Sequence, residues 1–456
     1  MNINIKKIAY SLSLVLLLGA CDYFEPEIVV DPNNPSLDGV LQDASKAELQ
    51  SLITGLEARH RVPFENATEL FGSFGREVYA YFGSDPRFTE EWLGIEIDDT
   101  YPDFFASGGT FLSPYQAIKQ ANVIIDAAEN TEAITQQERL GYEGFARTIK
   151  GYQYLYPLMQ QWDNGIRIDV NDPLNPGPIL PYDDALTEIR NLLDQGADDL
   201  RAAGESFAFS LTSGFDGFNT PAAMLEVNRA IAARVAIYDE DWQGALTALS
   251  ESFMDLEGDL MAGPAHVYGE APDINNPFFY PLNAITNTIL IVHPSMVEDA
   301  LEGDLRMDKF FERDQPVTNA TMINVNTGEL IPGQYQDNRW ATNLDPVKFI
   351  RNEELVLIYA EANAQLGNST EAVNAINVVR NTWGLEDYSG ATTTDALVDE
   401  ILFQRRYSLW AEGGHRYIDT RRYGRLDEIP TELEGGTVFE RISRRNSEIN
   451  WETLDN

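Results

Sequence analysis

Residues 351–383 constrain the fold more than any other stretch, because they predict two helices folded back on each other. Apolar residues fall at positions i, i+3, i+4, i+7 and i+11 in each half, which is one face of a helix: Leu355, Ile358, Tyr359, Ala362 and Leu366, then Ala372, Ala375, Ile376, Val379 and Trp383. Between the halves, Gly367 can take the left-handed conformation that ends a helix, and Asn368 with Glu371 fits a capping box. A helical hairpin cannot bury its outer face alone, so we expect similar hairpins stacked beside it.

The same periodicity recurs along most of the chain. It predicts helices over 42–59, 65–82, 114–130, 135–161, 183–203 and 397–410, and a second hairpin over 220–253. The joint of that hairpin begins at Asp239 and resembles a calcium-binding loop, but Ser250 stands where a bidentate Glu is required. We therefore interpret the joint as a tight turn between helices. Repeated hairpins predict a mainly α fold of tetratricopeptide-like helical repeats with little β-structure.

Two long segments break the helical pattern. Residues 83–113 and 258–346 are rich in Gly, Pro, Asn and aromatic residues and show no sustained period. A non-periodic stretch as long as 258–346 inside a globular body is usually functional or a small inserted subdomain. We therefore look for a binding site in these two segments.

The composition is that of a globular protein with a strongly acidic surface. Of the 456 residues, 43% are hydrophobic and 11% aromatic, which excludes a disordered chain. The 73 acidic and 32 basic residues give a net charge of -41, which repels phosphate backbones, so we expect no nucleic-acid partner. We interpret the acidity as a solvated surface. Extended calcium binding by the acidic groups is the alternative.

The N-terminus has the parts of a bacterial lipoprotein signal. In residues 1–20, two lysines precede an apolar core, and small residues stand directly before Cys21, the only cysteine. A lipoprotein signal peptidase cuts at this pattern, so we expect Cys21 to become an N-terminus acylated with chains such as palmitate. An ordinary buried thiol is the alternative. Residues 21–40 are acidic and proline-rich, which is typical of an extended tether.

Signatures of catalysis are absent from the sequence. It contains no H-E-x-x-H, G-x-S-x-G, P-loop or G-x-G-x-x-G motif, and its four histidines lie far apart. We therefore expect a protein that is not an enzyme and binds neither a metal nor a cofactor. A carboxylate pair for glycoside hydrolysis is a spatial arrangement without a motif, so that alternative stays open.

One cluster of charged residues near the C-terminus looks catalytic at first sight: His415, Arg416, Asp419, Arg421 and Arg422. Arg and Asp side chains so close after a helix end more often satisfy exposed carbonyl groups and tie two elements together. We interpret this cluster as structural.

Aromatic residues beside polar ones in the non-periodic segments are the remaining candidates for a site. A sugar presents flat C–H faces and a fringe of hydroxyls, so its site needs a Trp or Tyr plate with polar side chains at the edge. Each aromatic alone is more often part of a core, but the combination favours a surface site. The candidate ligand-binding residues are Arg76, Asp85, Arg87, Trp92, Tyr101, Phe104, Tyr268, Tyr280, Tyr335, Asp337, Arg339 and Trp340.

Several motifs together resemble the SusD/RagB family, and the likeness spans essentially the whole chain. They are Ile358-Tyr359-Ala360-Glu361-Ala362, Ala375-Ile376-Asn377-Val378-Val379-Arg380, Trp383-Gly384-Leu385, Arg405-Arg406-Tyr407-Ser408-Leu409-Trp410, the stretch 412–424, and Gly75-Arg76-Glu77 followed by Asp85-Pro86-Arg87-Phe88. The chain departs from the family pattern in two places. Gln404 stands where the family often has Glu, and residues 443–448 replace a closing proline-rich strand.

The resemblance implies an α-helical fold of four tetratricopeptide-like units that carries a loop-rich ligand-binding face. It also implies a surface lipoprotein of the outer membrane, anchored through Cys21, that covers a SusC-like TonB-dependent transporter and delivers oligosaccharide to it. We expect an N-terminal helical region over 41–257, a loop-rich insertion over 258–346 and a C-terminal region over 347–456. The leading hypothesis is a non-catalytic glycan-binding lipoprotein. A peptide-binding lipoprotein of the same uptake type and a surface glycosidase are the alternatives.

Overall fold

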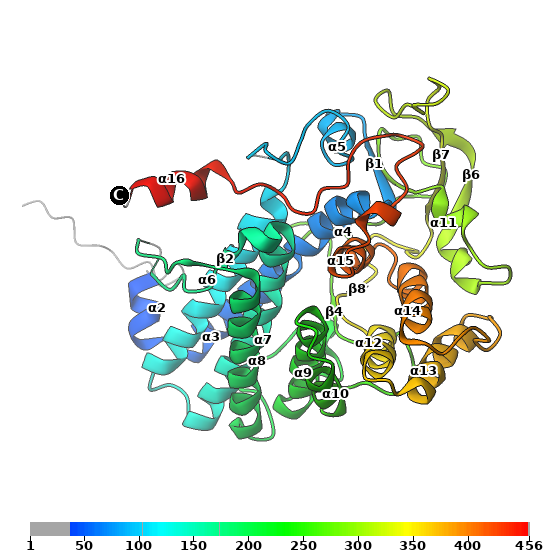
Figure 1. Cartoon of the computed structure of the whole chain (residues 1–456). Coiled ribbons are helices and arrows are strands. Elements are labelled where there is room, and N and C mark those ends of the chain that lie inside the picture. The colour runs from blue at the N-terminus through cyan, green and yellow to red at the C-terminus, as the bar shows by residue number, and fades with distance from the viewer. Residues whose placement is uncertain (1–36, 103, 173, 455–456) are drawn as a thin grey trace, which may run out of the picture.

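The computed structural model describes residues 37–102, 104–172 and 174–454. The predicted signal 1–20 and the acylation site Cys21 lie outside the described residues, as does most of the predicted tether. The last residues of that tether, 37–40, belong to a helix. Figure 1 shows a broad body of helices with a small sheet at one corner, and a C-terminal helix at the opposite side.

The helices, in chain order, are α2 (Leu37–Asp43), α3 (Lys46–His60), α4 (Val62–Phe74), α5 (Arg87–Glu90), α6 (Gly108–Asn130), α7 (Gln136–Gln161), α8 (Tyr182–Ala202), α9 (Pro221–Tyr238), α10 (Trp242–Ser250), α11 (Ser295–Glu298), α12 (Asn352–Gln365), α13 (Ser369–Thr382), α14 (Thr394–Ser408), α15 (His415–Arg422) and α16 (Asn446–Leu454). They confirm the predicted mainly α fold. We call α3, α4, α6–α10 and α12–α15 the helical frame.

The strands are short: β1 (Val78–Phe82), β2 (Ile166–Arg167), β3 (Ile179–Leu180), β4 (Ala265–His266), β5 (Thr288–Val292), β6 (Phe310–Val317), β7 (Gly333–Asp337) and β8 (Val347–Lys348). Four of them form one antiparallel sheet in the order β1-β5-β7-β6. The pairs β2–β3 and β4–β8 are small separate ladders. Little β-structure was expected, and these strands confirm it.

The hairpin predicted over 351–383 is confirmed as α12 and α13. Gly367 has φ of 79°, the left-handed conformation expected at the helix stop. The predicted capping box is wrong, because the Asn368 amide donates to Oδ1 of Asn363 at 3.1 Å and caps no N–H of α13. Buried alanines on both helices pack with apolar residues of α14 into a core cluster of their own.

Helices α7 and α8 lie close together because α7 carries glycines at the contact. A Cβ on Gly144 would come within 2.7 Å of Leu200, and one on Gly151 within 2.7 Å of Leu193. Heavy atoms that are not bonded do not approach this closely, so any larger residue would push the helices apart. In Figure 1, α6 to α10 continue this arrangement as a stack of antiparallel neighbours.

Two predicted helix bounds are wrong. The helix expected over 65–82 ends at Phe74, and Val78–Phe82 is strand β1, whose five residues are all buried. Four of its five residues, Val78, Tyr79, Tyr81 and Phe82, are β-branched or aromatic, which suits a strand, and pairing with β5 overrides the helical continuation. The helix expected to begin at 114 begins at Gly108 instead, and Pro114, which usually marks a helix start, lies inside it.

The charged cluster at 415–422 ties three helices together, as its structural interpretation predicts. Arg405 of α14 bonds Asp419 of α15 at 2.6 Å, and Arg422 bonds Glu361 of α12 at 2.7 Å. All four side chains are almost entirely buried. Buried charges are tolerated only when paired, so these two ion pairs fix how α12, α14 and α15 pack.

His60, at the end of α3, is neutral inside an aromatic box. Its ring centroid lies 5.1 Å from Tyr152, 4.7 Å from His266 and 4.6 Å from Phe349. Its Nδ1 accepts a hydrogen bond from Nε2 of Gln153 at 2.8 Å. Burial lowers the pKa of His60 to about 3, so the charged imidazolium is strongly disfavoured in the folded state.

This burial predicts a pH dependence of stability. An unfolded histidine titrates near 6.5, so between pH 3 and 6.5 the unfolded chain binds more protons than the folded one, and stability is lost as the pH falls. Between pH 7 and 5, the free energy of unfolding should fall by about 2 kcal/mol more in the wild type than in His60→Phe. Urea titrations at the two pH values measure this difference, and equal pH dependence of both proteins would contradict it.

Candidate functional site: a covered sheet and its loops

The first of the two predicted segments leaves directly from the four-stranded sheet, and the second contributes strands to it. Strand β1 ends at Phe82, just before segment 83–113, and β5, β6 and β7 belong to segment 258–346. Val78 pairs with Val292 and Phe82 with Thr288 across β1 and β5, and β5 then pairs with β7. The sequence therefore located both segments, although it did not show that a sheet joins them.

Two further segments, 319–332 and 431–437, lie over one face of this sheet, and we call them the sheet cover. Between sheet and cover lies an apolar cluster: Tyr79, Tyr81, Leu93, Ile289, Ile291, Met322 and Ile331. The Tyr81 hydroxyl donates to the Ile331 carbonyl at 2.8 Å, and the Val325 N–H donates to the Leu433 carbonyl at 2.9 Å. The cover is therefore held both to the sheet and within itself.

Arg76 is fully buried beneath this cover and pairs with Glu434. It also donates to the carbonyls of Ser73 at 2.9 Å and Leu93 at 3.0 Å, and the Tyr79 hydroxyl donates to Glu434 at 2.8 Å. All of these partners are protein groups. The structure thus places Arg76 in the support of the binding face and not on its surface.

Trp92 and Phe104 are also buried, with exposed fractions of 1% and 2%. The Trp92 indole donates to the Phe105 carbonyl at 3.0 Å, and the Phe104 ring packs edge-on against Phe439 at 5.4 Å. Both rings are core packing, because neither presents a face to solvent. Their sequence context could not show this, since Phe439 is far along the chain.

Asp85, Arg87 and Tyr101 do reach the surface beside α5. The Arg87 guanidinium bonds both oxygens of Asp85, at 3.0 and 2.6 Å, and lies 4.1 Å over the ring of Phe105. The hydrogen bonds from Arg87 lower the pKa of the Asp85 carboxyl to about 2. Tyr101 is 43% exposed. These side chains form a small aromatic and charged surface on the loop that follows β1.

The polar groups of the Asp337, Arg339 and Trp340 side chains form hydrogen bonds with one another. Arg339 binds Asp337 through two hydrogen bonds, at 3.0 and 2.7 Å, and the Trp340 indole donates to Asp337 at 3.1 Å. The Arg339 guanidinium also lies 4.7 Å from the ring centre of Trp410. Asp337 is almost buried. This trio ties the end of β7 to the segment after α14, and few of its polar atoms remain for a ligand.

Tyr268 and Tyr280 are half-buried along α4, where the Arg61 guanidinium lies 5.6 Å from the ring centre of Tyr268. Burial raises the pKa of both phenols, and it also raises the pKa of the nearby carboxyls of Glu65 and Glu69. The structure brings these two tyrosines onto one flank of the frame, and Tyr280 also packs against the apolar cluster between the sheet and its cover.

Tyr335 is the predicted residue that lines a hollow of ligand size. A groove of about 340 Å³, which we call the Tyr335 groove, runs between β5, β7, α11 and the sheet cover. Its lining residues are Val292, Pro294, Glu298, Asn324, Thr327, Glu329, Leu330, Ile331, Pro332, Gln334, Tyr335 and Leu433. The volume lies within the range of small-molecule sites, and an aromatic ring stands there beside amide and carboxylate groups. Asn324, Gln334 and Glu298 were not predicted, because they lie on the sheet cover, β7 and α11, and only the tertiary fold brings these three elements together.

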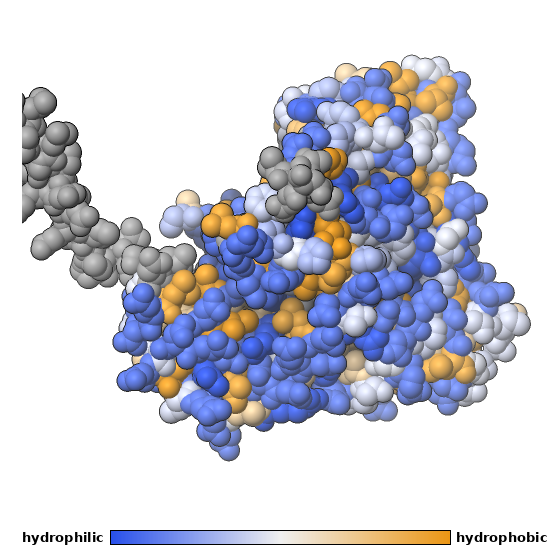
Figure 2. Space-filling view, turned by 60° about the vertical axis from the view of Figure 1, so that its left-hand side comes forward, coloured by the Kyte–Doolittle hydropathy of each residue, from blue (hydrophilic) through white to orange (hydrophobic). Residues whose placement is uncertain are grey.

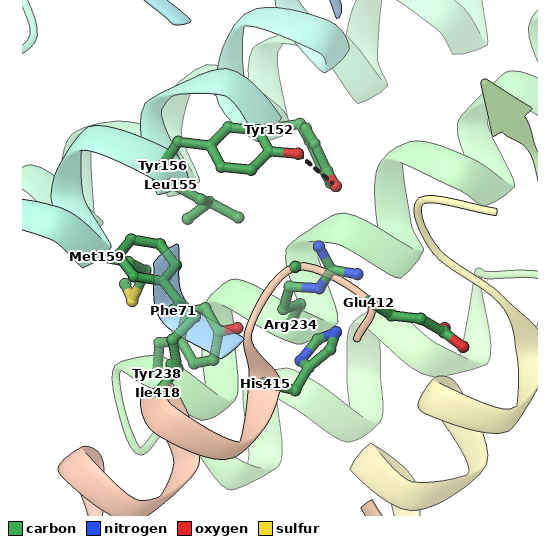
Figure 3. A pocket seen from close by; sticks show the side chains of 11 residues that line it. Phe71, Tyr152, Leu155, Tyr156, Met159, Arg234, Tyr238, Glu412, His415 and Ile418 are labelled. Atoms are coloured by element: carbon green, nitrogen blue, oxygen red, sulfur yellow. Dashed lines mark hydrogen bonds between the residues drawn. The ribbon is translucent and has the colours of Figure 1, made fainter. Parts of the chain in front are cut away.

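A second cavity, shown in Figure 3, lies in the middle of the helical frame. It is lined by Tyr152, Tyr156, Arg234, Glu412 and His415 among others, and the Tyr156 hydroxyl donates to that of Tyr152 at 3.1 Å. Its volume of about 30 Å³ is enough for a water molecule but far below that of a ligand site.

Within the described part of the chain, no three histidine, cysteine or acidic side chains gather where a metal ion could be held. None of the described helices combines the length and the apolar character that crossing a membrane requires.

Comparisons with known proteins agree on the fold. Residues 301–452 match the SusD family, and no curated protein matches the chain in sequence. NanU of B. fragilis is 17% identical, with 94% of this chain and 98% of that one covered at a TM-score of 0.66. Surface glycan-binding protein A from Bacteroides uniformis is 14% identical, with 89% and 98% covered at 0.65. A SusD superfamily protein from Bacteroides vulgatus ATCC 8482 is 16% identical, with 84% and 89% covered at 0.59.

The buried pair of Arg76 and Glu434 gives a prediction about the sheet cover. In Arg76→Met the Glu434 carboxylate would stay buried without its partner, so the free energy of unfolding should fall by about 3–5 kcal/mol. The matched control is Arg87→Met, which breaks an exposed pair with Asp85 and should leave the stability close to that of the wild type. Urea unfolding measures both. If the two variants were equally stable, Arg76 would not support the cover.

Proposed function

Because this chain belongs to the SusD/RagB family, we propose that it is a non-catalytic surface lipoprotein that captures oligosaccharide or polysaccharide in the Tyr335 groove. It hands the glycan to a SusC-like TonB-dependent transporter in the outer membrane, to which acyl chains on Cys21 anchor it. The family membership supports the uptake role, and the groove supports the ligand class.

The observation that carries the ligand class is the composition of the Tyr335 groove. The Tyr335 ring offers a flat apolar surface for the C–H face of a sugar. Asn324 Oδ1 already accepts from the Asn326 N–H at 2.9 Å, and Gln334 Nε2 donates to the Arg313 carbonyl at 2.9 Å. The other atom of each amide and the carboxylate of Glu298 can exchange directional hydrogen bonds with hydroxyls. Leu330 at the rim is 45% exposed and extends the apolar surface.

The position of the groove also suits a tethered capture protein. In Figure 1, the described chain begins at α2, whereas the sheet and its cover lie at the opposite corner, beyond the helical frame. An anchor attached before α2 therefore leaves the Tyr335 groove at the far end of the molecule. The surface formed by Arg87, Phe105 and Tyr101 lies on the loops that follow β1, and we include it in the proposed binding face.

Tyr335→Ala tests this proposal. Loss of an aromatic plate removes about 0.5–1.5 kcal/mol beyond its buried area, so affinity for the bound glycan should weaken about tenfold. Isothermal titration with gluco-, xylo-, manno- and fructo-hexasaccharides measures it. The control is Tyr388→Ala, which removes a tyrosine of similar exposure on the loop after α13 and should leave the affinity unchanged.

The same protein should leave a polysaccharide at its original length, because a capture protein binds without hydrolysis. Oligosaccharide released by the purified chain would show an enzyme instead. Absence of glycan binding together with stabilisation by peptides in thermal melts would show a peptide-binding protein. Either result would overturn the proposal.

A further inference from the structure

A ligand-sized hollow on the helical side of the molecule lies between α6 and the C-terminal helix α16, and of the two predicted segments only Phe111 and Leu112, at the end of 83–113, contribute to it. Its volume is about 590 Å³, and we call it the α16 groove. In Figure 1, α16 lies beside α6 and β2, well away from the sheet cover. Figure 2 turns this side forward and shows apolar surface gathered in several patches among polar residues. The groove is therefore separate from the Tyr335 groove.

One face of α6 forms the floor and one rim of the α16 groove. The lining residues on this helix are Phe111, Leu112, Tyr115, Lys119, Asn122, Val123 and Asp126. The exposed or half-buried members recur at intervals of three or four, so they project from α6 in a row along the groove. The row places apolar rings at one end and polar groups at the other.

Two side chains of that row suit a polar ligand with apolar faces. The Tyr115 hydroxyl is already used, since it donates to the Arg167 carbonyl at 2.8 Å, so only the ring of Tyr115 faces the groove. The half-buried carboxamide of Asn122, by contrast, makes no hydrogen bond with any described residue. A half-buried amide without a partner offers both a donor and an acceptor to whatever enters.

Helix α16 supplies the opposite wall through Ser447, Glu448 and Trp451. Trp451 is 36% exposed, the most exposed of the seven tryptophans. Polar contacts fix the start of the helix: Arg167 donates to Glu448 at 3.1 Å, and Arg445 donates to Ser107 at 3.1 Å. A large accessible indole, on a helix held in place by an ion pair and a hydrogen bond, provides a surface on which a ligand ring can stack.

A second hollow of about 520 Å³ continues from the first, because both are lined by Arg167 and Trp451. Its other walls are Asp163, Asn164, Pro178, Ile179, Pro181 and Arg444. The two hollows together form a track with the indole in its middle. Such a track suits a chain of several units better than a single small molecule.

We propose that the α16 groove is a second, independent binding site for an extended neutral oligosaccharide stacked on Trp451. The ligand class rests on the proposed function, and the location rests on the groove itself. A neutral chain fits because the charged residues that border the track balance one another, with Asp126, Glu448 and Asp163 on one side of the count and Lys119, Arg167 and Arg444 on the other. The net charge of -41 of the whole protein further disfavours anionic sugars. The Trp451 and Tyr115 rings contact the C–H faces, and Asn122 binds hydroxyls.

Trp451→Ala in the full-length protein tests the site, with Ile449→Ala as the matched control. Ile449 is on the same helix and is 40% exposed, but it does not line the groove. The probes are gluco-, xylo-, manno- and fructo-hexasaccharides, measured by isothermal titration and by tryptophan emission. We expect at least one probe to shift the emission and to bind about tenfold more weakly to Trp451→Ala and Asn122→Ala. Ile449→Ala should bind as the wild type does.

The Tyr335→Ala background separates the two sites. Binding that survives Tyr335→Ala should disappear in the double variant with Trp451→Ala. If Trp451→Ala and Ile449→Ala both bind like the wild type while Tyr335→Ala does not, the α16 site is overturned and the proposed function stands. If Trp451→Ala alone weakens binding, the α16 site stands and the Tyr335 groove is overturned. If no probe binds, or if only a hydrophobic peptide shifts the emission, the α16 site is overturned.

Discussion

The antiparallel pairing of β1 with β5 is the interaction on which the binding face depends. It joins Val78–Phe82, directly after the N-terminal helices, to Thr288–Val292 in the middle of the long non-periodic segment. Buried backbone groups need hydrogen-bond partners, so the pairing fixes where the loops leave both strands. Arg76 and Glu434 then hold the sheet cover over the paired strands. The side chains of the Tyr335 groove therefore stand on fixed supports, although several of them belong to loops of the sheet cover.

The helical frame, which carries the sheet and its loops, keeps one fixed arrangement. The buried ion pairs of Arg405 with Asp419 and of Arg422 with Glu361 allow only one packing of α12, α14 and α15. The cavity at the centre of the frame holds about one water, whereas the grooves of about 340 and 590 Å³ lie at its margins. Binding at the margins of a fixed frame needs no rearrangement of the core, which suits a protein that captures and releases long ligands.

Periodicity predicted most of the helical frame, because the buried face of a helix is visible in the local sequence as regularly spaced apolar residues. The α12–α13 hairpin and the left-handed Gly367 followed from spacing alone. Long-range contacts could not be predicted: β1 was assigned to a helix, and Arg76 was assigned to the ligand surface because Glu434 lies far along the chain. Trp451 was not among the predicted ligand-binding residues for the same reason, because its exposure depends on which part of the protein α16 packs against. The sequence located the loops, but only the fold decides which of their side chains face outward.

The central claim is that ligand contacts only the margins of a fixed frame, and hydrogen–deuterium exchange of the whole chain tests it most directly. The measurement compares the protein alone with the protein saturated by the hexasaccharide that binds most tightly. The account predicts slower exchange in the sheet cover at 324–332, in β7 at 333–335 and in the first turns of α16, with exchange across α12 and α13 unchanged. Slower exchange within the α12–α13 hairpin, with none in the two grooves, would contradict it.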